Sequence, residues 1–211
     1  MKKSPVEILT EISKLVYTGK SDLHYENILQ LLIAVILSAQ TTDQRVNMVT
    51  PALFAKYPTP HDLANAEYNE VSMIISSLGL YRNKANNLIN MAKTLIEEFK
   101  GIVPNNRDDL IKLPGVGRKT ANVVLSEGFK IPAIAVDTHV KRVANRLGLT
   151  NSDNVLKIEE DLEIFFPQEL WGKAHISLVH FGRYFCKSQN PQCDKCPFKK
   201  FCLYYQHKTT K

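Results

Sequence analysis

A lysine and an aspartate occupy positions that suit nucleophilic chemistry. Lys119 follows the string Leu-Pro-Gly-Val-Gly-Arg, and Asp137 opens a second string, Asp-Thr-His-Val-Lys-Arg. We expect Lys119 in the first turn of a helix, where the helix dipole and the neighbouring Arg118 disfavour a charged amine. Burial would disfavour the charge further, and an uncharged amine can act as a nucleophile and form a Schiff base. A lysine that contacts phosphate as a cation is the simpler alternative.

Asp137 precedes a helical pattern in which Val140, Val143, Ala144 and Leu147 recur on one face. An aspartate at this place is a natural N-cap, which is a purely structural role. A capping carboxylate is also held in one orientation and stays ionised. Asp137 therefore also suits a position opposite a developing positive charge.

Gly115 and Gly117 lie in a turn between two expected helices. The first helix is expected over residues 107–112, and the second begins after Gly117 and ends near Gly128. Glycines leave backbone N–H groups uncovered beside the positive end of the following helix, an arrangement that suits a phosphate oxygen. An ordinary turn between two helices is the alternative.

The four cysteines of the chain are confined to one short segment. They are Cys186, Cys193, Cys196 and Cys202, with the spacing C-x6-C-x2-C-x5-C. Such clustering implies one shared centre, and both zinc and an iron–sulfur cluster accept four thiolates. Zinc is the commoner metal, but zinc ribbons usually show two C-x2-C pairs and this segment has one. Disulfides are disfavoured because nothing in the sequence suggests secretion.

The strings LPGVGRKTA and VDTHVKR resemble the helix-hairpin-helix DNA glycosylases, specifically the endonuclease III group. The string LSAQTTD at residues 37–43 and the cysteine spacing resemble the same group, so the resemblance covers nearly the whole chain. It implies a bifunctional DNA glycosylase and abasic-site lyase of base excision repair. Such an enzyme removes oxidised pyrimidines from duplex DNA and nicks the strand 3′ to the abasic site by β-elimination. By this resemblance Lys119 forms the Schiff base, Asp137 stabilises the cationic sugar, and the cysteines hold a [4Fe–4S] cluster.

The resemblance also implies contacts with DNA. Gln40 would enter the base stack where the damaged base has left, and Leu80 would act as a wedge between base steps. The other positions expected at the DNA are Thr41, Tyr81, Arg82, Lys84, Gly115, Val116, Gly117, Arg118, Lys195 and Lys199. From the sequence alone, the simpler interpretation of Leu80 is a loop leucine that packs inward.

The fold implied by the resemblance is all-α, with two helical lobes and a DNA-binding cleft between them. A six-helix barrel domain would span residues 21–131 and contain the helix-hairpin-helix at about residues 107–128. The second helical domain would join residues 1–20 to residues 132–211 and contain the cluster loop, residues 186–202.

Apolar periodicity predicts the helices and shows no convincing strand. Helices are expected over residues 5–16, 27–38, 85–99 and 154–166, from a cap at Asp43 toward Tyr57, and from Pro167 to about Phe185. Thr59 and Pro60 suit an N-cap and a first-turn proline. Residues 27–38 are apolar on all sides, which predicts a central, buried helix. Glu159, Glu160, Asp161 and Glu163 are expected to form a solvated face.

Charge and composition favour a globular protein that binds nucleic acid. The net charge is +6, and residues 183–211 carry seven Lys or Arg against one acidic residue. Such a basic segment suits phosphate binding, although a solvated tail is the alternative. No apolar stretch is long enough to span a membrane, and no apolar signal core follows the basic N-terminus. We expect a monomer in the cytoplasm, associated with the nucleoid, that binds damaged double-stranded DNA and no membrane.

Three other functions fit parts of the sequence. An adenine or thymine mismatch glycosylase belongs to the same superfamily, but the adenine enzymes lack a lysine at the place of Lys119. They also carry a long C-terminal domain, whereas nine residues follow Cys202. A non-catalytic helix-hairpin-helix module has no need of Lys119 together with Asp137. An electron carrier has no need of the basic segment or of the hairpin.

Overall fold

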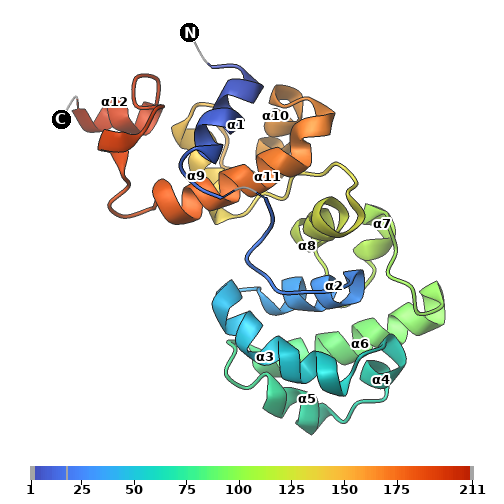
Figure 1. Cartoon of the computed structure of the whole chain (residues 1–211). Helices are drawn as coiled ribbons and strands as arrows, with labels where there is room; N and C mark the ends of the chain where they lie inside the picture. The colour runs from blue at the N-terminus through green and yellow to red at the C-terminus, as the bar shows by residue number, and fades with distance from the viewer. Residues whose placement is uncertain (1–2, 18, 210–211) are drawn as a thin grey trace. The chain divides into compact units, whose positions relative to one another are not determined.

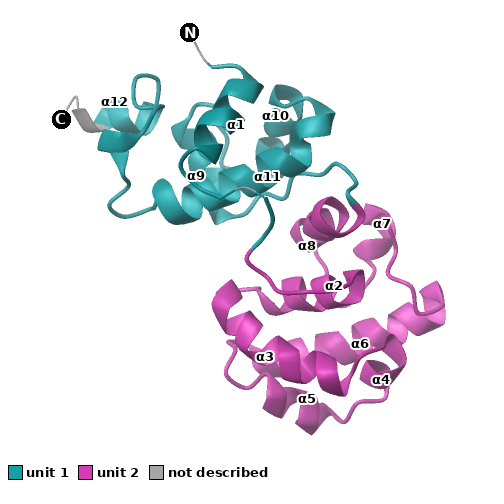
Figure 2. Cartoon of the chain, viewed as in Figure 1, with its two compact units in different colours: residues 1–21, 130–211 teal, residues 22–129 magenta. Residues whose placement is uncertain are grey.

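The computed structural model describes residues 3–17 and 19–209, and the chain forms two compact units (Figure 2). One unit joins Met1–Ser21 to Lys130–Lys211, and the other comprises Asp22–Phe129. Figure 1 shows the order of the elements, which are helices throughout the described residues, with no strand among them. The prediction of an all-α protein is therefore confirmed.

The unit Asp22–Phe129 is built around α2 (Ile28–Leu37). Every residue from Leu31 to Leu37 is buried, and α2 contacts α3, α6, α8 and η1. A helix that is apolar on all sides needs neighbours on all sides, and α2 has them. The predicted central helix is confirmed. The other elements of this unit are α3 (Asp43–Lys56), α4 (Pro60–Ala64), α5 (Tyr68–Ile74), α6 (Tyr81–Phe99), α7 (Arg107–Leu110), α8 (Arg118–Val123) and the π-helix η1 (Val124–Phe129).

Local side-chain chemistry determines where the helices of this unit begin, and two of the predicted starts need correction. Thr59 caps α4 and Pro60 stands in its first turn, as predicted. The predicted cap at Asp43 is wrong by one residue, because the Thr42 hydroxyl accepts the N–H of Arg45 at 3.4 Å. The long helix α6 begins at Tyr81, one turn before the predicted start at residue 85.

The predicted helix end near Gly128 is confirmed to within one residue. The chain continues from α8 into η1, which reaches Phe129. A Cβ atom on Gly128 would lie 3.0 Å from Cδ2 of Leu31 in α2. Gly128 therefore allows η1 to approach the central helix closely, which is a packing role rather than a capping role.

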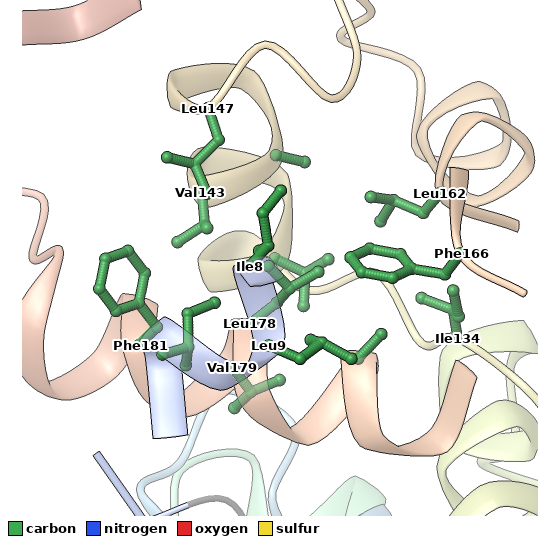
Figure 3. Packing of buried hydrophobic residues seen from close by; sticks show 14 of the residues in the cluster. Ile8, Leu9, Ile134, Val143, Leu147, Leu162, Phe166, Leu178, Val179 and Phe181 are labelled. Carbon is green, nitrogen blue, oxygen red and sulfur yellow. The ribbon is translucent and has the colours of Figure 1, made fainter. Parts of the chain in front are cut away.

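The second unit has its own hydrophobic core, shown in Figure 3. Ile8, Leu9 and Ile12 of the N-terminal helix pack with residues of α9, α10 and α11. Burying each of these side chains contributes about 1.5–3 kcal/mol. The N-terminal helix is therefore an integral part of this unit. Its elements are α1 (Pro5–Ser13), α9 (Thr138–Arg146), α10 (Val155–Phe165), the 3-10 helix η2 (Gln168–Leu170), α11 (Trp171–His180), the π-helix η3 (Phe181–Phe185), the 3-10 helix η4 (Cys193–Lys195) and α12 (Leu203–Thr209).

Two features of this unit differ from expectation. Glu159 is only 2% exposed, so the predicted solvated acidic face of α10 is wrong at this residue. Glu160, one position along, is exposed as expected. The short helix α12 was not predicted, because a segment of seven residues is too short to show a periodic pattern. None of the described helices combines the length and the apolar character that crossing a membrane requires.

Candidate active site, DNA-contacting residues and cysteine centre

The glycine hairpin joins α7 to α8, and a side-chain hydrogen bond fixes the two helices. The Nε atom of Arg107 donates to Oδ1 of Asn122, a fully buried residue, at 2.8 Å. Gly115 has a φ of +82°, and a Cβ atom there would lie 3.1 Å from the Asn87 side chain of α6. The turn therefore needs glycine at position 115 for its backbone conformation and for space.

The hairpin amides differ in their availability. The Val116 N–H donates to the carbonyl of Leu113 at 3.0 Å, and the Val116 side chain is buried. The N–H groups of Gly115 and Gly117 donate to no backbone acceptor among the residues that the structure describes. Gly117 is the N-cap of α8 and supplies no side-chain cap. These two glycine amides remain available for an anion, whereas the Val116 amide does not.

Lys119 lies in the first turn of α8, as predicted, but its side chain is exposed and not buried. The position faces away from the core of its unit. Within the described part of the chain, the Lys119 amine has no hydrogen-bond or ion-pair partner. Its neighbour Arg118 is exposed as well. An exposed primary amine without a partner is free to react with a ligand.

Asp137 is the N-cap of α9, which confirms the predicted structural role. Its Oδ1 atom accepts hydrogen bonds from the backbone N–H groups of His139 and Val140, both at 2.8 Å. The residue is half-buried. Its Oδ2 atom accepts no hydrogen bond from the residues described. The carboxylate is thus fixed by one oxygen while the other remains available. Lys119 belongs to the unit Asp22–Phe129, and Asp137 belongs to the other unit.

Gln40 and Leu80 both adopt the left-handed backbone conformation, with φ of 54° and 59°. Both side chains are exposed, and Leu80 is 54% exposed, so the inward-packing interpretation of Leu80 is wrong. A Cβ atom on Gly79 would lie 3.9 Å from the Gln40 carbonyl, so the two segments are neighbours. Left-handed conformations of residues other than glycine are strained and concentrate at functional sites.

The first turn of α6 carries three further residues expected at the DNA. Arg82 is exposed, and its guanidinium carbon lies 5.6 Å from the centre of the Tyr81 ring. Lys84, by contrast, is buried, and its Nζ donates to the Thr41 hydroxyl at 2.8 Å. The sequence pattern did not indicate this burial.

The four cysteines are free thiols, and all four line a single pocket. Phe181 and Phe185, stacked at 5.2 Å between ring centres, line the same pocket together with Tyr204 and Tyr205. Burial raises the pKa of the Cys196 thiol to about 11 and also raises the pKa of Cys202. Within the described ranges, no three or more His, Cys, Asp or Glu side chains surround the position of a single metal ion.

Two arginines of α9 hold the cysteine segment, and the sequence did not reveal them. The Nη1 atom of Arg146 donates to the Cys186 sulfur at 3.3 Å and to the Lys187 carbonyl at 2.8 Å. Its guanidinium lies 3.9 Å from the centre of the Tyr204 ring. The Nε atom of Arg142 donates to the Cys186 carbonyl at 3.1 Å. The helix that Asp137 caps therefore also anchors the first cysteine of the segment.

Gly182 permits this contact between α9 and η3. A Cβ atom on Gly182 would lie 2.9 Å from Cβ of His139 and 3.1 Å from the His139 carbonyl. The Nη2 atom of Arg142 donates to the Gly182 carbonyl at 2.6 Å. A larger residue would push η3 away from α9, so close approach of the backbone explains glycine at this position.

Basic side chains lie around the cysteine segment. Lys195 is exposed, and Lys199 is half-buried with its Nζ 5.8 Å from the centre of the Tyr205 ring. A hollow of about 500 Å³ opens beside this segment. It is lined by His139, Arg142, Gly182, Arg183, Lys187, Ser188, Gln189 and Asn190. Three cations and a histidine line this hollow, which therefore suits an anionic ligand.

Comparison with known proteins identifies the family. The sequence model of the HhH-GPD superfamily base excision DNA repair protein matches residues 33–168. Endonuclease III of Bacillus subtilis (strain 168) is 48% identical over 92% of this chain and 89% of its own length. Endonuclease III of Synechocystis sp. is 45% identical over 95% of this chain and 92% of its own length.

Two solved structures of endonuclease III with DNA resemble the whole chain. A non-covalent complex superposes with a TM-score of 0.93 at 48% identity, covering 98% of this chain and 97% of that chain. A trapped covalent intermediate, the estranged-adenine complex, gives 0.92 at 48% identity, covering 97% and 96%. A thermostable thymine-DNA glycosylase gives 0.84 at 29% identity, covering 96% and 94%.

The helix-hairpin-helix fold and its lysine-bearing turn thus place the chain among base excision repair enzymes. The chain belongs to the HhH-GPD superfamily, in its endonuclease III group. It is a DNA glycosylase with abasic-site lyase activity.

Proposed function

We propose that this enzyme removes oxidised pyrimidines from damaged double-stranded DNA and then nicks the strand 3′ to the abasic site. The observation that carries the proposal is the exposed Lys119 amine on the first turn of α8, without a partner among the described residues. A structural relative with 48% identity forms a covalent intermediate with DNA. An amine in this position is the nucleophile that such an intermediate requires.

Lys119 would act in two steps. Its Nζ attacks C1′ of the damaged nucleotide while the glycosidic bond breaks and the base leaves with the bonding electrons. The nitrogen bonded to C1′ is then an ammonium, whose proton passes to the ring oxygen O4′ as the C1′–O4′ bond breaks, which yields a protonated Schiff base between Nζ and C1′. The iminium makes a C2′ proton acidic, so that proton leaves and the 3′ phosphate departs by β-elimination. Water then hydrolyses the Schiff base and restores the amine.

Asp137 would stabilise the positive charge that the sugar develops as the glycosidic bond breaks. Two backbone N–H groups fix its Oδ1, so the carboxylate needs no reorganisation during the reaction. The reaction requires the Lys119 amine and the Asp137 carboxylate to reach the same sugar. The target nucleotide must leave the base stack for this reaction.

DNA binding would combine phosphate contacts with replacement of the extruded nucleotide. The free amides of Gly115 and Gly117, together with Arg118 and Arg82, suit backbone phosphates. Gln40 and Leu80 would fill the gap in the base stack. Lys195 and Lys199 would add phosphate contacts from the cysteine segment.

The four cysteines would hold a [4Fe–4S] cluster. Support comes from their position around a single pocket and from Arg146, whose cation faces the Cys186 sulfur. When bound, the cluster would serve as a structural tie for residues 186–202 and would supply no step of the reaction. The protein would act as a monomer in the cytoplasm, associated with the nucleoid.

A panel of duplexes tests the proposed substrate. Each duplex carries one site: an oxidised pyrimidine, an abasic site, adenine opposite an oxidised guanine, a G·T mismatch or no damage. We expect strand cleavage of the first two without alkali treatment, and none with Lys119→Ala. If a duplex with either mismatch is cleaved in preference to the others, the protein is instead a mismatch glycosylase. If the protein binds these duplexes and cleaves none of them, it is a non-catalytic DNA-binding module.

A further inference from the structure

The amine of Lys84 is buried and bonded to a single hydroxyl group. The residue is 4% exposed, and its Nζ donates to Oγ1 of Thr41 at 2.8 Å. Burial lowers the pKa of this amine, and no ion pair to a described residue offsets the burial. A buried cation without a carboxylate partner is unfavourable, so its presence at the start of α6 requires a reason.

The Lys84–Thr41 hydrogen bond joins two segments that lie 43 residues apart in the sequence. Thr41 directly follows Gln40. Lys84 itself belongs to the segment that carries Leu80, because its N–H donates to the Leu80 carbonyl at 3.0 Å in the first turn of α6. One lysine therefore links the segment that carries Gln40 to the segment that carries Leu80.

Each of the two linked segments carries a residue in a strained backbone conformation. Gln40 and Leu80 have φ values of 54° and 59°, and their side chains are exposed. Residues other than glycine persist in the left-handed region only where surrounding contacts hold them there. The turn at Gln40 has three such contacts at Thr41, one of which is the Thr41 hydroxyl donating to the Ala39 carbonyl at 3.4 Å. The Thr41 N–H donates to the Ser38 carbonyl at 3.1 Å, and the Thr41 hydroxyl accepts the Lys84 amine.

We propose that Lys84 is a positioning residue that holds the turn at Gln40 and Thr41 against the start of α6. Gln40 and Leu80 are thereby presented to DNA as one rigid pair. The proposal rests on the gap-filling roles proposed above for these two residues. It differs from the expectation that Lys84 contacts a phosphate.

Salt dependence separates the two roles. A lysine that contacts a phosphate releases a counterion, so its removal lowers the slope of log affinity against log salt by about 0.9. A lysine that positions other residues leaves this slope unchanged. Arg82, which is exposed in the same helical turn, provides the matched control, because Arg82→Met is expected to lower the slope by about one.

The experiment measures the affinity of the full-length protein for a duplex that contains a tetrahydrofuran abasic-site analogue, over a range of salt concentrations. We expect Lys84→Met and Thr41→Val each to weaken binding about tenfold without changing the slope. Thr41→Ser keeps the hydroxyl and is expected to retain affinity. In the Lys84→Met background, Gln40→Ala is expected to cost little more, because Gln40 is already misplaced.

A slope that falls in Lys84→Met as it does in Arg82→Met would overturn the proposal and assign a phosphate contact. Additive effects of Lys84→Met and Gln40→Ala would overturn it as well. Both results leave the gap-filling role intact if Gln40→Ala alone weakens binding. If Gln40→Ala alone does not weaken binding, the positioning role of Lys84 and the gap-filling role of Gln40 are both overturned. Should Lys84→Met fail to fold, Thr41→Val breaks the same hydrogen bond from its half-buried partner.

Discussion

The Oδ1 atom of Asp137 accepts a hydrogen bond from the backbone N–H of Val140 at 2.8 Å. The N–H of His139 donates to the same oxygen, also at 2.8 Å. The two carboxylate oxygens therefore differ. Oδ1 caps α9, whereas Oδ2 accepts no hydrogen bond from the described residues. Capping and charge stabilisation are compatible in one residue, and substitution can separate them.

Asp137→Asn is expected to abolish the reaction while keeping the fold. The amide oxygen of asparagine still accepts both backbone N–H groups, so α9 keeps its cap. The negative charge is lost, and excision should fall by at least about 100-fold. Asp137→Ala loses both functions and should also lower the free energy of unfolding by about 1 kcal/mol. Thermal unfolding and cleavage of a lesion duplex check both variants; wild-type excision by Asp137→Asn would contradict the proposed role.

Leu80→Gly is expected to stabilise the fold and to weaken DNA binding. Glycine relieves the left-handed strain at φ 59°, which is worth about 1 kcal/mol, but it removes the wedge. Lys100 provides a matched control, because it has a φ of 55° at the end of the same helix. Lys100→Gly should raise stability similarly and leave affinity for an abasic-analogue duplex within about twofold. Loss of affinity in both variants to the same degree would contradict a specific role of Leu80.

Replacing a cysteine is expected to remove the proposed cluster. Wild-type protein should be brown and contain about four iron atoms per chain, whereas Cys186→Ser should lose colour and iron. Residues 186–202 should then become accessible to protease, since the tie is gone. Metal analysis, visible absorption and limited proteolysis provide the measurements. Colourless wild-type protein that contains zinc would refute the cluster.

Acid stability is expected to depend on Thr150. Its hydroxyl donates to Oδ2 of Asp161 at 2.6 Å, and this bond, followed by the bond from Lys157, lowers the pKa of the Asp161 carboxyl. A lowered carboxyl pKa stabilises the fold above its unfolded-state value of about 4, and the contribution is lost as pH falls through the lower folded-state pKa. Thr150→Val should therefore be less stable than wild type near neutral pH, with the difference shrinking below about pH 4. Thermal unfolding across this range is the measurement, and a difference that grows in acid would contradict it.

Features that local chemistry decides could be predicted from the sequence. Asp137 as a cap, Thr59 with Pro60 at the start of α4, and the buried helix α2 follow from short patterns that need no distant partner. The lysine-bearing hairpin was recognisable for the same reason, because its glycines and Lys119 are close in the sequence. Family comparison then confirmed the class of enzyme.

Features that depend on distant neighbours could not be predicted. Lys84 was expected at the DNA, and only the fold shows that Thr41 lies beside its amine. Glu159 belonged to an acidic run, yet the packing of α10 buries it. The exposure of Lys119 could not be predicted either, because the side of α8 that faces the core is decided by contacts with other helices. The hydrogen bonds of Arg146 to the cysteine segment likewise join residues some 40 positions apart.

Borohydride trapping tests the central claim most directly. The reagent reduces a Schiff base to a stable amine, so any chain covalently attached to DNA is preserved for electrophoresis. With a duplex containing an oxidised pyrimidine, wild-type protein should give a cross-linked species whose attachment site maps to Lys119, and Lys119→Ala should give none. Absence of the adduct in wild type, or its persistence in Lys119→Ala, would contradict the account.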